Sequence, residues 1–386
     1  MNILIFSQRF WPENFRINSI AKKLSKKNNI LVVTEKPNYP GIKKTKKKIK
    51  SELPYEKWQS IEIFRASTFK RGESSKFRLL INYLNFIIFS PFVLFRKLNK
   101  KKINIIFIYA TSPIFQAIPA IIFGKVYKIP VVLWVQDIWP DVLKDLNVVK
   151  KKLILDFINF FVNKIYANSD YIFVQSETFK KKISKNIKKK IEVLFNPETN
   201  KVKNTKNKNK KFTITYAGNI GKAQSFETLI DAVKKIKNPN LIIKIYGDGS
   251  EKKKLQSYII KSKLSETIKI FNSVSKNKID NILSESNALL LMLGKGEGLA
   301  STLPAKIQTY VSHCKPIIVS SDGESYNFVK ENKLGFSSKA GDSHSLYKSL
   351  LKAKKLKKKK LSLIRKRSII LFKKNLFKKP LNVLIL

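Results

Sequence analysis

The sequence predicts two doubly wound α/β domains, each built on a parallel sheet that helices cover. Short β-rich runs alternate with longer helical patterns along the whole chain, which is typical of such sheets. The strand-like runs are nearly continuously apolar, as expected of strands buried on both faces. A polar stretch without periodicity interrupts the alternation near the middle of the 386 residues. A chain of this length suggests two domains.

In the first half of the chain, helical patterns fill the gaps between strand-like runs. We expect strands at 2–7, 30–34, 61–66, 104–110, 131–136, 171–176 and 191–195. We expect helices at 17–28, 76–98, 114–127, 152–168 and 177–186.

A linker is expected at 196–211, where the sequence NPETNKVKNTKNKNKK is charged and aperiodic. The domains are then 1–195 and 212–386, with the C-terminal helix a candidate to pack back on the first domain. Strands are expected in the second domain at 212–218, 241–247, 267–272, 288–293 and 316–320. Ligands of doubly wound domains bind at the carboxyl ends of the strands, so we expect a binding cleft between the two domains.

The formal net charge of +52 raises the question of nucleic acid. The charge is mostly lysine, in runs spread along the chain, whereas specific nucleic-acid sites gather arginine and aromatic residues on one surface. We therefore expect no nucleic-acid partner. Most of the charge is typical of an AT-rich coding sequence, and attraction to anionic lipid is the main functional interpretation.

The expected location is the cytoplasm. Cys314 is the single cysteine, which fits a reducing compartment, and the start MNILIFSQRF lacks the features of a secretory signal. Segment 77–98 has the length of a membrane span, but Arg78 and Pro91 interrupt it. Two interpretations have equal weight: a helix that attaches the protein peripherally to the inner face of the cytoplasmic membrane, and a helix packed on the first sheet.

Three strand-to-helix junctions in the second domain are rich in small residues, as loops that bind phosphate are. The first carries Gly218, Asn219, Gly221, Lys222 and Gln224, with Ser225 a candidate N-cap. The second carries Gly247 and Gly249. In the third, Thr302 is a candidate N-cap, Pro304 is expected at the first helical position and Lys306 in the first turn.

Lys306 is an unfavourable choice for that first turn on stability grounds, because the helix dipole favours negative charge there. A bound anion would reverse this judgement. We therefore expect Lys306 to supplement the helix N-terminus in binding a diphosphate.

Five segments in consistent order resemble the GT-B glycosyltransferases of family 4. They are FSQRFWPENFRIN, LWVQDIWPD, YAGNIGKAQSFETLIDA, YGDGSEKKKL and LPAKIQTYVSHCKPII. The branch that they resemble includes bacterial L-fucosamine (N-acetylfucosamine) transferases of O-antigen and capsule assembly. The resemblance implies two Rossmann-like domains facing a cleft, with the nucleotide sugar held by the C-terminal domain and the acceptor by the N-terminal one.

The resemblance also implies the donor-binding residues. The broader family has two glutamates separated by seven residues where this chain has Ser301 and Thr309, and Pro304 with Lys306 replaces part of that apparatus. Asn219 stands at a position where arginine is usual. The implied donor-binding positions are Gly218, Asn219, Lys222, Gly247, Asp248, Val274, Ser301, Pro304, Lys306 and Thr309.

In the N-terminal domain, the resemblance implies that Glu13 and Arg16 approach the acceptor and the diphosphate. Asp137 ends a predicted strand and is a candidate to orient the acceptor hydroxyl or accept its proton. The alternative, an N-cap for the helix after IWPD, has equal weight. Arg16 and Lys306 complete the candidate catalytic set. No D-x-D pair occupies a suitable loop, so neither a metal nor another cofactor is expected.

The expected reaction is transfer of a sugar from a nucleotide diphosphate, with a UDP-linked N-acetylated deoxysugar as the expected donor. The expected acceptor is a polyprenyl-diphosphate-linked saccharide of cell-surface polysaccharide, O-antigen or lipopolysaccharide. Retention of configuration is implied by the resemblance. The alternatives are a sugar-nucleotide epimerase of similar fold, a nicotinamide-dependent enzyme, disfavoured because G-x-G-x-x-G does not follow the first strand, and a basic nucleic-acid-binding protein.

Overall fold

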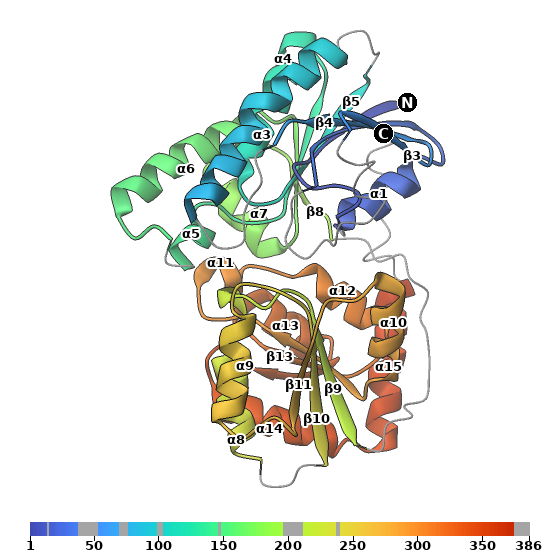
Figure 1. The fold of residues 1–386 in the computed structure, drawn as a ribbon, viewed down its shortest axis with the longest axis vertical. Coiled ribbons are helices and arrows are strands. Elements are labelled where there is room, and N and C mark those ends of the chain that lie inside the picture. The colour runs from blue at the N-terminus through green and yellow to red at the C-terminus, as the bar shows by residue number, and fades with distance from the viewer. Residues whose placement is uncertain are drawn as a thin grey trace. The chain divides into compact units, whose positions relative to one another are not determined.

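The computed structural model describes residues 1–13, 15–37, 53–68, 76–98, 103–145, 148–195, 211–236 and 240–373. The chain divides into two compact units, with the boundary between Leu194 and Phe195 (Figure 1). The expected linker, 196–211, lies outside the described residues except for residue 211. Residues 374–386 also lie outside them, so a C-terminal helix that packs back on the first unit stays a prediction.

The first unit is built on an eight-stranded sheet in the order β3-β4-β2-β1-β5-β6-β7-β8. All neighbouring strands are parallel except the β3–β4 pair. The strands are β1 Asn2–Phe6, β2 Asn29–Glu35, β3 Tyr55–Trp58, β4 Ile61–Ala66, β5 Ile105–Ala110, β6 Val131–Val135, β7 Tyr171–Val174 and β8 Ile191–Val193. The sequence missed β3, because an edge strand with alternating exposure has no continuous apolar run.

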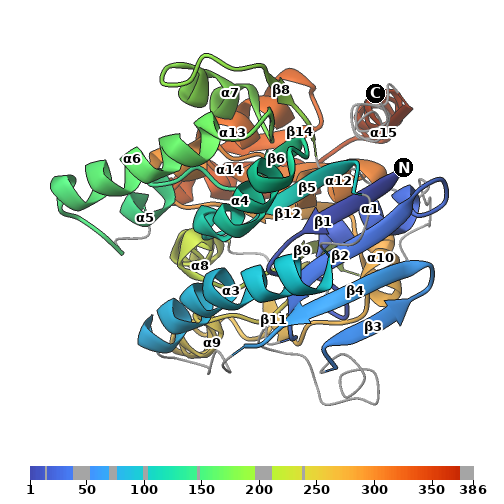
Figure 2. The same ribbon diagram turned by 90° about the horizontal axis from the view of Figure 1, so that it is seen from above.

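Helices cover both faces of this sheet, and a separate apolar cluster fills each face. On one face, α3, α4 and α6 lie side by side as an outer layer (Figures 1 and 2). The helices are α1 Arg16–Leu24, α3 Lys76–Lys97, the 3-10 helix η1 Ile114–Ala117, α4 Ile118–Tyr127, α5 Asp141–Asp145, α6 Lys152–Ala167 and α7 Glu177–Ser184. In the described part of the chain, no helix has both the length and the apolarity that crossing a bilayer requires.

The second unit is built on a six-stranded parallel sheet in the order β11-β10-β9-β12-β13-β14. Its strands are β9 Phe212–Ala217, β10 Leu241–Tyr246, β11 Ile268–Phe271, β12 Ala288–Met292, β13 Ile317–Ser320 and β14 Gly335–Ser338. The sequence missed β14, whose residues GFSS carry only one large apolar side chain. Two doubly wound sheets are the architecture that the sequence predicts.

Helices also pack on both faces of the second sheet, over two apolar clusters. They are η2 Lys222–Gln224, α8 Glu227–Lys234, α9 Lys252–Lys261, α10 Lys276–Glu285, α11 Glu297–Ala300, α12 Ala305–Ser312, α13 Gly323–Glu331, α14 Ser343–Lys354 and α15 Lys358–Lys373. The last described helix, α15, packs against α12 of its own unit.

Candidate functional site

The three loops predicted to bind phosphate lie at one edge of the second sheet. In this sheet β9 neighbours both β10 and β12, so the strand order reverses at β9. Chain crossovers on either side of such a point go to opposite faces and leave a crevice at the carboxyl ends of the strands. The loops after β9, β10 and β12 all start from that edge because the strands are parallel.

Two glycines let the first two loops touch through their backbones. Gly218 has a φ of 143°, which strongly favours glycine, and its N–H donates to the Tyr246 carbonyl at 2.9 Å. A Cβ on Gly247 would lie 1.9 Å from the Gly218 carbonyl oxygen. The Ile220 N–H donates to the Asp248 carbonyl at 2.9 Å. The two loops therefore form one rigid wall, and a side chain at Gly247 would separate them.

Lys306 enters from the third loop and reaches the first. Helix α12 begins at Ala305, so Lys306 lies in its first turn, where no acidic residue is present. The Lys306 Nζ donates to the Tyr216 hydroxyl at 2.8 Å and lies 4.2 Å from the centre of the Tyr216 ring. A Cβ on Gly218 would lie 2.7 Å from the same Nζ. The ammonium group therefore sits against the glycine loop.

The surroundings of Lys306 disfavour its charge. Burial lowers the pKa of Lys306 from 10.5 to about 7. Among the described residues, no carboxylate lies within ion-pair distance of its Nζ. Its hydrogen-bond partner is Tyr216, whose hydroxyl in turn donates to the Asn219 carbonyl at 2.6 Å. An anion in the crevice would supply the missing partner and raise the pKa again.

Asn219 and Lys222 are exposed on the first loop. The Asn219 side-chain amide lies 3.5 Å from the Gln224 side-chain oxygen, which also accepts the Gly221 N–H at 2.9 Å. Lys222 opens the 3-10 helix η2, and no ion pair of its ammonium is found within the described part of the chain. Both side chains are therefore accessible to a ligand at the same edge as Lys306.

Three predictions about helix starts are wrong. Ser225 adopts a left-handed conformation with a φ of 46°, and α8 begins two residues later, with Phe226 at the N-cap position. The Thr302 hydroxyl donates to the Gly298 carbonyl at 2.8 Å, because the short helix α11 precedes it and offers a free carbonyl. Pro304 takes the N-cap position of α12 instead of the first helical position. In the described residues, α12 therefore starts without a side-chain cap.

Asp248 ties two loops together. Its carboxylate accepts hydrogen bonds from Lys252 at 2.6 Å and from the Ser273 hydroxyl at 2.9 Å. Burial raises the pKa of Asp248, but the hydrogen bonds from Lys252 and Ser273 outweigh burial and hold the pKa below its ordinary value. Asp248 thereby positions the loop after β11, on which Val274 is partly exposed. This geometry gives Asp248 a positioning role.

Ser301 and Thr309 lie on either side of Lys306 in the sequence. The Ser301 side chain is buried, and its hydroxyl donates to the Glu297 carbonyl at 2.6 Å. Thr309 is partly buried in α12. The Ser301 hydroxyl is therefore used in a hydrogen bond at the end of α11. The family resemblance implies a glutamate at this position in the broader family.

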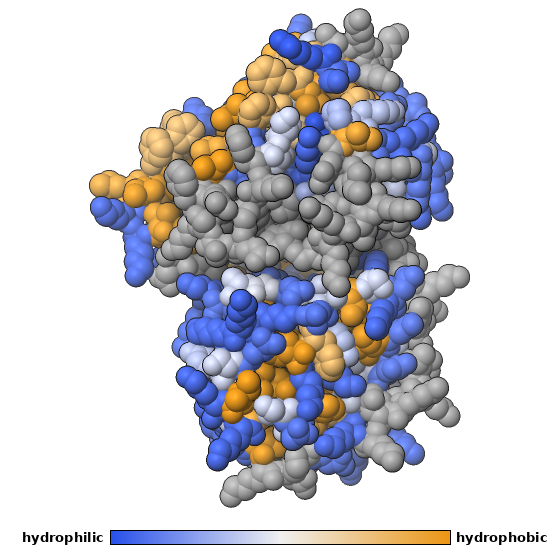
Figure 3. Space-filling view, in the orientation of Figure 1, coloured by the Kyte–Doolittle hydropathy of each residue, from blue (hydrophilic) through white to orange (hydrophobic). Residues whose placement is uncertain are grey.

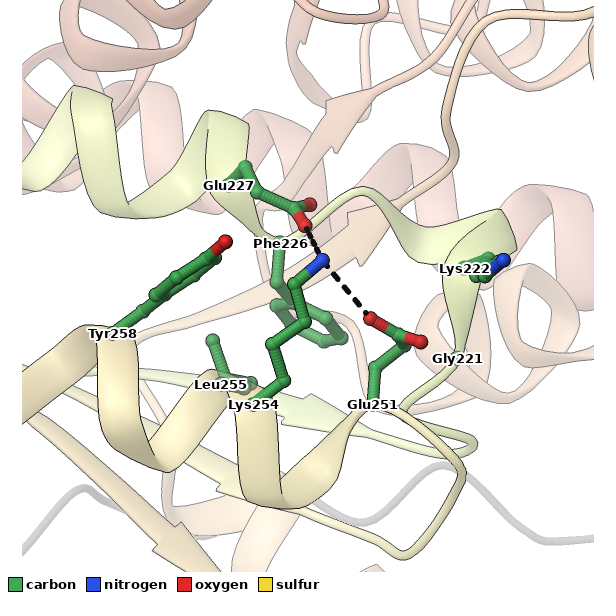
Figure 4. Close-up of a pocket in the computed structure, with 8 residues that line it drawn as sticks. All are labelled: Gly221, Lys222, Phe226, Glu227, Glu251, Lys254, Leu255 and Tyr258. Carbon is green, nitrogen blue, oxygen red and sulfur yellow. Dashed lines mark hydrogen bonds and ion pairs between the residues drawn. The ribbon is translucent and has the colours of Figure 1, made fainter. Parts of the chain in front are cut away.

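A pocket that the sequence did not indicate adjoins the first loop, lined by Gly221, Lys222, Phe226, Glu227, Glu251, Lys254, Leu255 and Tyr258. Figure 4 shows Lys254 between two carboxylates, with Lys222 turned away from them. The Lys254 Nζ lies 3.1 Å from Glu227 and 3.3 Å from Glu251. The signal available in the sequence was the spacing of Glu251 and Lys254, which places them on one helix face. Because Lys254 is already paired with two carboxylates, this pocket fits an anion less well than the position beside Lys306.

Asp137 lies at the end of β6 in the first unit and bonds to the loop after β5. Its carboxylate accepts the Ser112 hydroxyl at 2.8 Å and the Ser112 N–H at 3.2 Å. The N-cap alternative is wrong, since α5 begins at Asp141 and the Asp137 carboxylate bonds elsewhere. Burial raises the pKa of Asp137, and the Ser112 hydrogen bonds oppose that rise.

Arg16 opens α1 and acts electrostatically on the same region. Burial raises the pKa of Tyr109, while Arg16 lowers it and Asp137 raises it. Both charges therefore act on the Tyr109 hydroxyl. Arg16 and Asp137, which the sequence placed after separate strands, thus act with opposite sign on the pKa of the same tyrosine.

Glu13 lies in a buried ion-pair network. Its side chain is 2% exposed and its carboxylate lies 3.5 Å from the Arg9 guanidinium, which also pairs with Glu35. The same guanidinium donates to the Asn82 side-chain oxygen at 3.1 Å. This burial favours a structural role for the Glu13 carboxylate over the acceptor contact that the sequence predicts.

Comparison with known proteins finds a family model that matches part of the chain. Residues 197–368 match the family model described as glycosyl transferases group 1. No curated protein shows significant sequence similarity to the chain.

Three solved structures share the fold of the whole chain. HepE of Anabaena in complex with UDP and glucose has a TM-score of 0.71 at 13% identity, covering 100% of this chain and 99% of that one. Sucrose-phosphate synthase from Thermosynechococcus elongatus has a TM-score of 0.72 at 11% identity, covering 96% and 94%. The apo form of the lipopolysaccharide outer core galactosyltransferase WaaB has a TM-score of 0.65 at 14% identity, covering 100% and 99%. The chain therefore has the GT-B fold, and residues 197–368 are similar to glycosyl transferases group 1.

Proposed function

We propose that the protein is a glycosyltransferase that transfers a sugar from a nucleotide diphosphate donor to a hydroxyl of an acceptor saccharide. The observation that carries the proposal is the Lys306 ammonium, which lies against Gly218 at the carboxyl edge of the second sheet and bonds to Tyr216 instead of a carboxylate. A diphosphate at this position would give the Lys306 ammonium a negatively charged partner. The group 1 domain of residues 197–368 supports the same reaction class.

UDP is the proposed nucleotide. Structural neighbours of the same fold were solved with UDP, with UDP and glucose, and with UDP-glucose. In the proposed complex, Lys222 and Lys306 contact the diphosphate and the uracil lies near Val274. Gly218 and Gly247 allow the backbone to approach the phosphates closely.

The transfer breaks the bond between the anomeric carbon and the diphosphate oxygen and forms a bond from that carbon to the acceptor oxygen. The electron pair of the broken bond leaves with UDP, so negative charge develops beside Lys306 and the α12 N-terminus, which stabilise it. The acceptor hydroxyl loses its proton, and Asp137 is the proposed group that orients this hydroxyl or accepts the proton. Because burial raises the pKa of Asp137, it is a better proton acceptor than an exposed aspartate.

The finer assignments follow from the family resemblance. The proposed donor sugar is an N-acetylated deoxysugar, and the proposed acceptor is a polyprenyl-diphosphate-linked saccharide at the inner face of the cytoplasmic membrane. The pathway is O-antigen, capsule or lipopolysaccharide assembly, and transfer retains the anomeric configuration. The scheme uses lysine, arginine and helix N-termini to balance charge, so it requires neither a metal nor another cofactor. A chelator is expected to leave the rate unchanged.

A sugar-nucleotide epimerase is the second candidate, because it would use the same UDP-sugar crevice. Transfer and isomerisation give different products: a transferase releases UDP only when an acceptor is present, whereas an epimerase changes the sugar without an acceptor. Product analysis with and without a lipid-linked saccharide separates the two.

The first experiment is calorimetric binding of UDP, GDP, NAD and a short DNA duplex at physiological salt. We expect UDP to bind and Lys306→Ala to weaken its binding by about 10- to 100-fold, as loss of one charge-assisted contact does. Lys261→Ala, which removes an exposed lysine from α9, is the matched control and should leave affinity unchanged. Binding of DNA alone, with a steep salt dependence, would replace the proposal with a basic binding protein.

A further inference from the structure

Helix α3 buries polar as well as apolar side chains and leaves several apolar side chains exposed. Its polar side chains Asn82, Asn85 and Ser90 are buried, while Ile88 is 57% exposed and Phe92 is 54% exposed. The buried Asn82 accepts a hydrogen bond from Arg9 at 3.1 Å, which accounts for a polar residue on the inner face. These three polar residues therefore point inward, and the outer surface of α3 carries large apolar side chains.

Helix α6 exposes a second apolar stripe on the same side of the first unit. Leu153, Phe157 and Phe160 are 84%, 65% and 56% exposed, and their spacing places them on one helical face. Phe157 packs edge-on against Phe161 at 4.9 Å between ring centres. Exposed aromatic rings that pack on one another cover little of their own area, so this stripe remains available to a partner.

Helix α4 connects the two stripes. It packs against α3, and both α3 and α6 pack against η1, which runs directly into α4. Val126 of α4 is 59% exposed. Figures 1 and 2 show α3, α4 and α6 side by side, and Figure 3 shows apolar side chains along the same flank. We define the apolar face as Ile88, Phe92, Val126, Leu153, Phe157 and Phe160.

Positive charge surrounds this face. Arg96 lies over the Phe92 ring at 5.7 Å and Lys164 lies over the Phe160 ring at 5.4 Å. Lys125 and Lys128 are exposed at the end of α4, and Lys151 and Lys152 are exposed at the start of α6. The sequences of α3 and α4 contain no acidic residue, and that of α6 contains only Asp156. Two copies of this face would bring like charges together, which disfavours a homodimer here.

We propose that the apolar face docks on an anionic phospholipid bilayer, with its rings in the acyl boundary and its lysines and arginines at the headgroups. Rings inserted in the membrane plane and a basic rim are the two features that bind a monotopic surface. This inference deepens the proposed function: docking would bring the protein to the membrane that presents a lipid-linked acceptor. Only this role of the docking rests on the proposed function. Docking can be measured without any sugar transfer.

The first test is flotation of the whole protein with vesicles of phosphatidylglycerol and phosphatidylethanolamine, compared with vesicles of phosphatidylcholine. The measurement is made at about 0.5 M salt, where a Debye length of roughly 4 Å suppresses binding through net charge alone. We expect Phe157→Ser with Phe160→Ser to lower the partition coefficient by at least about tenfold. Ile260→Ser is the matched control, because Ile260 is 68% exposed on α9 of the second unit.

A second test reports which surface touches lipid. Phe157→Cys provides a reactive thiol for an environment-sensitive fluorophore, because the native Cys314 is buried. We expect vesicles with nitroxide-labelled lipids to quench this label, and to leave the same label at Ile260→Cys unquenched. UDP binding, measured by calorimetry, should be equal in all variants. A protein that docks but does not bind UDP would remove the proposed function and leave this inference intact.

Four outcomes would overturn the inference. The wild type stays with the soluble fraction in anionic vesicles, or the double serine variant floats as well as the Ile260→Ser control. Alternatively, the wild type forms a concentration-dependent dimer that the serine substitutions dissociate, in which case the face joins two copies of the chain. Quenching at both labels would mean that binding is through charge and has no preferred face.

Discussion

The Lys306 ammonium lies 2.8 Å from the Tyr216 hydroxyl and 4.2 Å from the centre of the Tyr216 ring, although the two residues are 90 positions apart in the sequence. This relationship joins the start of α12 to the end of β9. Lys306 lies in the first turn of a helix, where the helix dipole disfavours positive charge. A phosphate would therefore be a favourable partner for its ammonium.

Binding of UDP-glucose should be accompanied by proton uptake. Lys306 has a pKa of about 7 in the unliganded protein, and a diphosphate beside it raises that pKa. Near pH 8 the lysine is mostly neutral before binding and protonated afterwards, so affinity should fall as pH rises through about 7 and above. Calorimetry in buffers of different ionisation enthalpy measures the uptake, which should vanish in Lys306→Met. Equal proton uptake in that variant would assign the titration to another group.

The free energy of unfolding should carry a pH dependence due to Lys306. Its folded pKa, about 7, lies below the ordinary value of 10.5, so between these limits the unfolded chain binds the extra proton. Stability therefore rises with pH in this window, by at most about 1.4 kcal/mol per unit from this group, and the cost of burying the charge is fully present below about pH 7. The stability difference between wild type and Lys306→Met, measured by urea unfolding from pH 6 to 10, isolates the contribution; a flat difference would contradict it.

Gly247→Ala should damage the second unit. Its Cβ would lie 1.9 Å from the Gly218 carbonyl, a backbone atom that cannot move without separating the two loops. We expect a loss of stability of about 1–3 kcal/mol or more, as overpacking costs, together with loss of UDP binding. Gly221→Ala is the control, because its Cβ would meet the Asn219 side-chain nitrogen at 2.8 Å, and that side chain can rotate away. Thermal unfolding of both variants checks the contrast.

Asp137→Asn should lower transfer without lowering stability. Burial disfavours the Asp137 charge, so a neutral isostere relieves that cost while still accepting the Ser112 hydroxyl. If Asp137 accepts the acceptor proton, we expect kcat to fall by about 10²- to 10⁴-fold with UDP binding unchanged. Rates measured with a lipid-linked saccharide test this. A variant with normal kcat would leave Asp137 as a purely structural link between the loops after β5 and β6.

Glu13→Gln should affect stability more than acceptor binding. Glu13 is 2% exposed and lies 3.5 Å from Arg9, so its removal leaves a buried guanidinium with one partner fewer. Breaking a buried ion pair costs about 3–5 kcal/mol, and the remaining Glu35 pairing should place the loss at or below the lower end of that range. KM for the acceptor should be unchanged in the folded fraction. A raised KM with normal unfolding would instead support the acceptor contact that the sequence predicts.

The elements themselves were largely predictable from local pattern. Continuous apolar runs predicted the buried strands, and glycine-rich junctions predicted the loops that meet at the edge of the second sheet. The missed strands β3 and β14 are edge strands, which need no continuous apolar run. Of the three wrong helix starts, that at Thr302 has a clear cause, since a capping side chain bonds to whichever free backbone group the neighbouring turn presents, here the Gly298 carbonyl.

By itself, the sequence determined the two-domain α/β architecture, the three loops and the position of Lys306 in a first helical turn, because these follow from residue spacing along the chain. Only the tertiary structure decided that Lys306 meets Tyr216, that Glu13 is buried against Arg9 and that α3 turns its asparagines inward. Those partners lie on different strands and helices. Their contacts depend on how sheets and helices pack. The spacing of residues within one element does not predict which residues of other elements pack against it.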